Sequence, residues 1–211
     1  ILIDTKSDEH IWAETYDREE SDIFALQSDV ALKIAKALKS NITADQEERI
    51  NEKLTESTDA YEYYLKGKEY ENAGSIKENL EAAIGEYERA VILDPNFAEA
   101  HALIGVNHLG MKWYGYDLSD DRIIQAKKSI DRALELKPNN ATVRYGLGIY
   151  HYHGFRNYAE AMKEFRYALN LEPGSATFNV FGGAIYRRLG DYEKAEESML
   201  LAYELDPRST F

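Results

Sequence analysis

The stretch Ala168-Leu-Asn-Leu-Glu-Pro173 ends an apolar helix with a proline, and three other segments of the chain repeat it. The other copies are Ala90-Val-Ile-Leu-Asp-Pro95, Ala133-Leu-Glu-Leu-Lys-Pro138 and Ala202-Tyr-Glu-Leu-Asp-Pro207. Because proline cannot continue a helix, each copy marks a helix end. Successive prolines lie 43, 35 and 34 residues apart. This spacing predicts a solenoid, in which each unit buries its apolar face against the next.

Six positions recur in each of these units with the same order of sizes: small, bulky, small, bulky, small, and then the proline. The four sets are Gly67, Tyr70, Ala83, Tyr87, Ala90 and Pro95; Gly105, His108, Ala126, Ile130, Ala133 and Pro138; Gly148, His151, Ala161, Phe165, Ala168 and Pro173; and Gly183, Tyr186, Ala195, Met199, Ala202 and Pro207. The pattern and its basic period of about 34 residues resemble the tetratricopeptide repeat (TPR), a pair of antiparallel helices. The resemblance covers residues 58–207.

We therefore expect an all-α fold, an α-α superhelix of four TPR helix pairs, for the domain at residues 58–211. The repeats are predicted at residues 58–95, 96–138, 139–173 and 174–207. The two earlier repeats carry extra residues, which we place in loops or added turns near 72–75 and 110–119. The second helix of each pair is predicted to begin at a residue whose side chain can cap free backbone amides, namely Ser75, Ser119, Asn157 and Asp191.

The first 57 residues differ from the repeats. Residues 1–20 contain two short strand-like runs around a polar turn, which predicts a β-hairpin. Apolar residues then recur with helical spacing, so residues 21–57 are predicted to form two linker helices. The segments Leu2-Ile-Asp4, His10-Ile-Trp-Ala-Glu-Thr-Tyr-Asp-Arg18, Asp22-Ile-Phe24, Gln27 and Tyr64-Leu-Lys-Gly67 resemble the end of a TolB-like domain.

In bacterial signalling proteins, such a domain often lies between an N-terminal nucleotide cyclase or kinase domain and a C-terminal TPR array. The resemblance implies that the hairpin is a remnant of that domain. The chain opens at Ile1 in an apolar run and stops shortly after Pro207. We therefore expect it to be a piece of a longer protein, with any catalytic domain upstream.

Composition narrows the function further. The chain has 38 acidic and 25 basic residues, a formal charge of −13, and no cysteine. The charge opposes binding to nucleic acid, and the lack of cysteine excludes disulfides, thiolate chemistry and cysteine zinc sites. No apolar run is long enough to span a membrane, so we expect a cytoplasmic protein without membrane contact.

Three residue patterns could suggest a cofactor, metal or acid-base site, but each has a structural explanation. Gly146 and Gly148 lie inside a repeat helix rather than after a strand, so they fit close packing better than a dinucleotide fingerprint. His108 and His151 occupy bulky packing positions of their repeats. Paired acids such as Asp120 and Asp121 suit the first turn of a helix. We therefore expect no enzyme activity, no cofactor and no metal.

The surface left free by the packing positions predicts a binding groove. It follows the first helix of each repeat and forms the concave face of the family. The candidate groove residues are Tyr61, Tyr64, Lys68, Val106, Leu109, Tyr145, Ile149, Tyr152, Val180, Arg187 and Arg188. TPR proteins that bind the carboxylate tails of chaperones use Lys, Arg and Asn in such grooves, whereas Tyr64, Ala102 and Tyr145 occupy them here.

The first functional hypothesis is a scaffold that binds a peptide or protein segment along this groove, with an acidic group of the partner near Arg187 and Arg188. The alternative is an intramolecular or self-associating module, with a homodimer formed through the hairpin residues Ile1, Ile3, Ile11 and Trp12. Small-ligand sensing ranks last. For the aromatic insert that contains Trp113, we favour packing against the next repeat over a second contact site.

Overall fold

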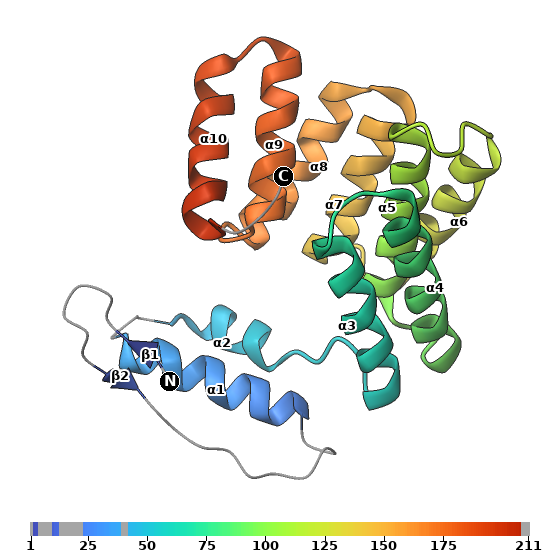
Figure 1. The fold of residues 1–211 in the computed structure, drawn as a ribbon. Helices are drawn as coiled ribbons and strands as arrows, with labels where there is room; N and C mark the ends of the chain where they lie inside the picture. The colour runs from blue at the N-terminus through green and yellow to red at the C-terminus, as the bar shows by residue number, and fades with distance from the viewer. Residues whose placement is uncertain (1, 4–9, 13–22, 39–41, 208–211) are drawn as a thin grey trace. The chain divides into compact units, whose positions relative to one another are not determined.

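The structure is a computed structural model, and it describes residues 2–3, 10–12, 23–38 and 42–207 (Figure 1). The chain divides into two compact units, residues 1–58 and 59–211. The first unit contains β1 (Leu2–Ile3) and β2 (His10–Trp12), an antiparallel pair in which Leu2 lies opposite Trp12. It also contains α1 (Ile23–Ala37) and α2 (Ala44–Asn51), where the Ser28 hydroxyl donates to the Ile50 carbonyl at 2.8 Å.

Ile1 lies outside the described residues, and so do the side chains of Ile3, Ile11 and Trp12. The dimer hypothesis built on them therefore stays a prediction, as does the TolB-like resemblance of this region.

The second unit is a series of four helix pairs (Figure 1). The first helices are α3 (Thr58–Asn72), α5 (Ala98–Trp113), α7 (Ala141–Ile149) and α9 (Ala176–Leu189). The second helices are α4 (Lys77–Leu93), α6 (Asp121–Leu136), α8 (Tyr158–Leu171) and α10 (Tyr192–Leu205). A π-helix, η2 (Tyr150–Gly154), extends α7. The predicted all-α superhelix of TPR-like pairs is confirmed.

The recurring small and bulky positions explain why the helices of a pair approach closely. A Cβ added to Gly105 would lie 2.6 Å from Ile130, and one added to Gly148 would lie 2.9 Å from the Phe165 ring. A Cβ added to Gly183 would lie 3.2 Å from Met199. The small second-helix positions Ala83, Ala90, Ala126, Ala133, Ala161 and Ala168 are fully buried. These small second-helix positions therefore belong to the core of this unit.

Two of the four predicted helix caps are confirmed. The Asn157 side chain accepts from the Glu160 amide at 3.3 Å, and the Asp191 side chain accepts from the Lys194 amide at 3.3 Å. The predictions for Ser75 and Ser119 are wrong by one residue, because Ile76 and Asp120 are the N-cap residues. Ser119 instead takes part in a turn, in which its amide donates to Asp117.

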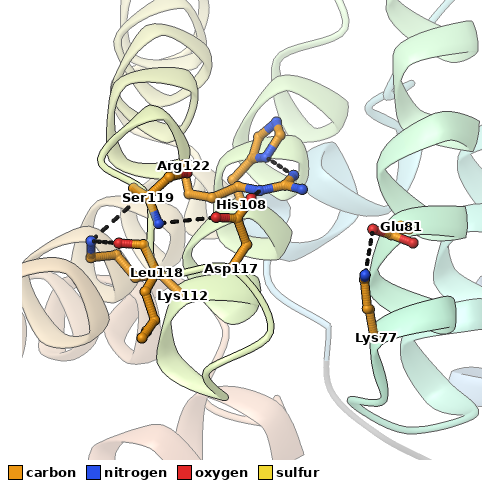
Figure 2. A network of polar contacts seen from close by, with 8 residues as sticks. All are labelled: Lys77, Glu81, His108, Lys112, Asp117, Leu118, Ser119 and Arg122. Carbon is orange, nitrogen blue, oxygen red and sulfur yellow. Dashed lines mark hydrogen bonds and ion pairs between the residues drawn. The ribbon is translucent and has the colours of Figure 1, made fainter.

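A polar network holds the loop that follows α5 (Figure 2). Asp117 accepts from the Ser119 amide at 2.9 Å and from Arg122 Nε at 2.8 Å. Arg122 Nη1 lies 3.0 Å from His108 Nδ1, and Lys112 donates to the Leu118 carbonyl at 2.9 Å. The extra residues of the second repeat thus form a hydrogen-bonded loop tied to the helices on either side.

Candidate functional site

A cavity of about 220 Å³ opens within the second unit, between the first helices of all four repeats. α3, α5, α7 and α9 each contribute side chains to its wall, together with η2 and the segment before α9. We call this space the groove cavity. Its lining residues are Tyr64, Lys68, Glu71, Asn72, Ser75, Leu80, Leu103, Val106, Asn107, Gly110, Tyr114, Thr142, Tyr145, His153, Glu172, Ser175, Thr177, Phe178 and Phe181.

Glu71 is a charged group of this wall that is held by two hydrogen bonds. Lys68 Nζ donates to its Oε2 at 3.0 Å, and Asn107 Nδ2 donates to its Oε1 at 2.7 Å. Asn107 is buried and also donates to the Leu103 carbonyl at 2.8 Å, which fixes the amide. The carboxylate therefore has a defined position between α3 and α5, since both of its oxygens accept a hydrogen bond.

The aromatic side chains of the wall pack against one another across repeats. The Tyr145 ring stacks on Phe178 with ring centroids 5.2 Å apart and meets the edge of Phe181 at 5.5 Å. Tyr64 packs on the fully buried Phe97 at 4.9 Å. Such contacts fix the rings and leave the cavity with a rigid aromatic surface.

Burial and nearby carboxylates both act on the tyrosine hydroxyls of the cavity. Burial raises the pKa of Tyr64, and the charges of Glu71 and Glu99 raise this pKa further. Burial and Glu71 likewise raise the pKa of Tyr145. Both phenols therefore stay protonated at neutral pH and can serve as hydrogen-bond donors.

His153 reaches the cavity from the π-helix. Its ring stacks on Trp113 with centroids 4.3 Å apart, and burial lowers its pKa to about 3. The ring is therefore neutral at pH 7, and its buried Nδ1 has no hydrogen-bond partner among the described residues. Trp113 also packs on Tyr152 at 5.0 Å, so the predicted packing against the next repeat holds for Trp113, whereas Tyr114 and Tyr116 of the same insert are exposed.

The structure places the sequence-predicted groove residues in three environments. Tyr64, Lys68, Val106 and Tyr145 line the groove cavity. A second group is buried in the helix packing and offers little surface: Tyr61, Leu109, Ile149 and Tyr152, with exposed fractions of 7, 0, 0 and 3%. Val180 is partly buried on α9, and Arg187 and Arg188 are exposed near its end.

Several cavity residues were missed by the sequence reasoning. The repeat register predicts Val180, Arg187 and Arg188 as the α9 contribution, whereas Phe178 and Phe181 of that helix line the cavity. Glu172 and Ser175 come from the segment that joins two repeats, and His153 comes from a π-helix. Only the size of Phe178 and Phe181 relative to their counterparts Val143 and Gly146 was a signal in the sequence.

The described residues also bear on metal binding and membrane insertion. Within the described part of the chain, no three His, Asp or Glu side chains form a group that could hold a metal ion. None of the helices described is both long and apolar enough to cross a bilayer.

Comparison with known proteins agrees with this geometry. Models of the tetratricopeptide repeat match residues 122–176 and 183–209. The crystal structure of a thermophilic TPR protein of Thermus thermophilus aligns with 90% of this chain and 89% of its own, at 17% identity and a TM-score of 0.51. This likeness shows the fold.

Two curated relatives share weaker sequence similarity. The putative adenylate cyclase 3 of Rhizobium meliloti (strain 1021) is 29% identical over 151 residues, which are 70% of this chain and 25% of the relative. The anaphase-promoting complex subunit 3 of Schizosaccharomyces pombe (strain 972 / ATCC 24843) is 28% identical over 139 residues, 66% of this chain and 19% of the relative. The chain thus spans a quarter or less of these proteins.

The fold and the matched segments define the class of this protein. Its second unit folds as an all-α superhelix of helix pairs, and models of the tetratricopeptide repeat match two segments of the chain, residues 122–176 and 183–209. Folds of this class generally serve binding rather than catalysis.

Proposed function

We propose that the chain binds an extended peptide segment of a partner protein along the first helices of its four repeats, with the groove cavity as the central contact. The observation that carries this proposal is that the cavity draws its wall from α3, α5, α7 and α9 together. A ligand there touches every repeat at once, as an extended peptide does when it lies in a groove.

The wall has the composition that peptide recognition uses. Tyr64, Tyr145 and Phe181 supply rigid aromatic surface, and rings of this kind dominate the binding energy of interfaces. Thr142, Ser175 and Thr177 supply short polar groups along the same wall. Arg187 and Arg188, exposed near the end of α9, can contact an acidic group of the same partner outside the cavity.

The relatives support a role within larger assemblies. One is named as a subunit of the anaphase-promoting complex and the other as a putative adenylate cyclase, and this chain matches only a part of each. We infer that the chain serves as the interaction module of a larger protein, and that the catalytic chemistry of any such protein lies outside it.

Selection of binding peptides tests the proposal. Peptides are selected from a random display library against the whole chain. The variant Thr142→Phe places a bulky ring in the cavity, so it should bind these peptides at least about 10-fold more weakly than the original chain does. The matched control is Asn170→Phe, an equally bulky change at an exposed position of α8, which should leave affinity unchanged. Thermal melting confirms that both variants fold. Equal affinity of the selected peptides for both variants would overturn the groove as the binding site.

A further inference from the structure

The groove cavity has the size of a single side chain. Its volume of about 220 Å³ is below the range of roughly 300–1,000 Å³ that sites for drug-sized ligands occupy. It therefore suits one side chain of a bound peptide better than a whole small molecule. The chemistry of that side chain can be inferred from the wall, and the inference rests on the proposed function.

Charge in the cavity is negative. Its wall contains the carboxylates of Glu71 and Glu172 and one cation, Lys68, which is already paired with Glu71 at 3.0 Å. His153 adds no charge at neutral pH because burial lowers its pKa to about 3. Burial is the main cause that raises the pKa of Tyr64, and the carboxylates of Glu71 and, more weakly, Glu172 raise it further, so their field reaches into the aromatic part of the wall.

The aromatic surface points to the same chemistry. The faces of Tyr and Phe rings carry negative potential and attract cations that lie over them. Tyr64, Tyr114, Tyr145, Phe178 and Phe181 all contribute to the wall. A neutral apolar side chain would use the rings but leave the carboxylates without a new partner, whereas a cation uses both.

One buried nitrogen of the wall has no hydrogen-bond partner among the described residues. This atom is Nδ1 of His153, and it is shielded from solvent. A buried polar atom in this state calls for an explanation, and a ligand that donates a hydrogen bond supplies one. The unprotonated nitrogen of a neutral imidazole can accept from an ammonium or guanidinium group.

We propose that the groove cavity binds a basic side chain of the partner peptide, with its cationic group beside Glu71 and Glu172 and its stem against the aromatic rings. Arginine fits best, because its planar guanidinium stacks on rings and forks to carboxylates. The partner segment recognised here is therefore basic at this position, opposite in charge to the acidic tails that carboxylate-binding TPR grooves hold.

A fragment titration tests the proposal directly. Nα-acetyl-L-arginine amide is added to the ¹⁵N-labelled whole chain, and the amide shifts of Val106, Gly110, Thr142 and Phe181 are followed by NMR. These shifts should saturate at a concentration at least about 10-fold lower than with the uncharged norleucine analogue. Because the chain carries a formal charge of −13, a cationic probe can also bind at other acidic parts of the surface. Only shifts that are confined to the cavity residues therefore support the proposal.

Charge-neutralising variants complete the test. Glu172→Gln and Glu71→Gln should each lower the affinity for the arginine probe about 5-fold or more. Glu197→Gln, a change at an exposed position of α10, should leave this affinity unchanged. Equal binding of the norleucine probe, preference for an acetyl-glutamate amide probe, or unchanged affinity in both cavity variants would overturn the proposal.

The peptide selection separates the two proposals. If groove-binding peptides show no basic residue and ignore Glu172→Gln, the basic-side-chain proposal fails while peptide binding in the groove stands. If the selected peptides bind elsewhere, the proposed function fails whatever the fragment does.

Discussion

Four glycines set how closely the helices of each repeat approach. Gly67, Gly105, Gly148 and Gly183 each face the bulky residue of the paired second helix. At the first three glycines the facing side chain, Tyr87, Ile130 or Phe165, is fully or almost fully buried, whereas Met199 opposite Gly183 is 37% exposed. Because a packed interior cannot move aside cheaply, the absence of a Cβ is a packing requirement at these positions rather than a backbone one.

A pair of glycines in the first repeat separates packing from helix propensity. A Cβ on Gly67 would overlap the Tyr87 ring, so Gly67→Ala should lower the free energy of unfolding by about 1–3 kcal/mol. A Cβ on Gly85 in α4 would meet no heavy atom of the described residues within 4 Å, so Gly85→Ala should raise it by up to about 1 kcal/mol. Urea denaturation measures both changes, and a similar effect of the two substitutions would contradict the packing argument.

Element boundaries show what the sequence predicts well and what it does not. The repeat spacing predicts the four helix pairs because each pair depends on contacts between residues close in sequence. A small residue of the first helix faces a bulky residue of the second, as Gly148 faces Phe165, and this pairing recurs in every repeat. The caps at Ser75 and Ser119 are misplaced by one residue because a serine that can cap a helix also suits a turn. In the structure Ser119 belongs to the turn closed by Asp117, which is set by tertiary contacts with Arg122.

The groove cavity was predicted only in part for a related reason. The repeat register assigns equivalent positions on successive first helices, and three of the residues that it selects, Tyr64, Val106 and Tyr145, line the groove cavity. It cannot anticipate the π-helix at Tyr150–Gly154, whose wider turns redirect the side chains that follow. Glu172 does recur, as the residue before the repeat proline, but it lies at the end of a second helix and is therefore absent from a register that follows the first helices.

The loop after α5 should make stability depend on pH. Burial and then Arg122 lower the pKa of His108 from 6.5 to about 4, so the folded protein keeps this ring neutral while the unfolded chain protonates it. The unfolded state thus binds more protons between about pH 4 and 6.5, and stability falls as pH drops through that window. At pH 5 the loss relative to pH 7 is about 1–2 kcal/mol after allowing for partial solvent screening.

Replacement of the ring isolates this contribution. The variant His108→Gln has no group that titrates in this range, so its stability should change less between pH 7 and pH 5 than that of the original chain. Urea denaturation at several pH values measures the difference. His151, for comparison, lies outside the network of Figure 2, and His151→Gln serves as the control. Parallel pH profiles for the original chain and His108→Gln would show that Arg122 and burial do not act on His108 as described.

Across the second unit, stability is a sum of repeat and neighbour terms, and the neighbour terms differ along the array. Leu169 on α8 and Tyr203 on α10 occupy the same repeat position, one residue after the small Ala168 and Ala202. Leu169 is partly buried and packs against the core, with its Cδ1 3.6 Å from where a Cβ on Gly182 would lie. Tyr203 is 66% exposed, as is Tyr192 on the same helix at 71%. The contact that anchors α8 is therefore missing from α10 among the described residues.

This difference predicts where the array opens first. Backbone amides of α10 should exchange with deuterium faster than those of α8, because local opening of α10 exposes less apolar surface. Leu169→Ala should cost about 1–2 kcal/mol, since it removes a packed side chain that is only partly buried. Tyr203→Ala should cost less than about 0.5 kcal/mol, because the ring is mostly in solvent. Hydrogen exchange read by mass spectrometry, together with urea denaturation of the two variants, measures both effects. Slow exchange in α10, or a large cost for Tyr203→Ala, would mean that this face of α10 is covered in solution, and the neighbour contact would then have to come from another molecule or from another part of the protein.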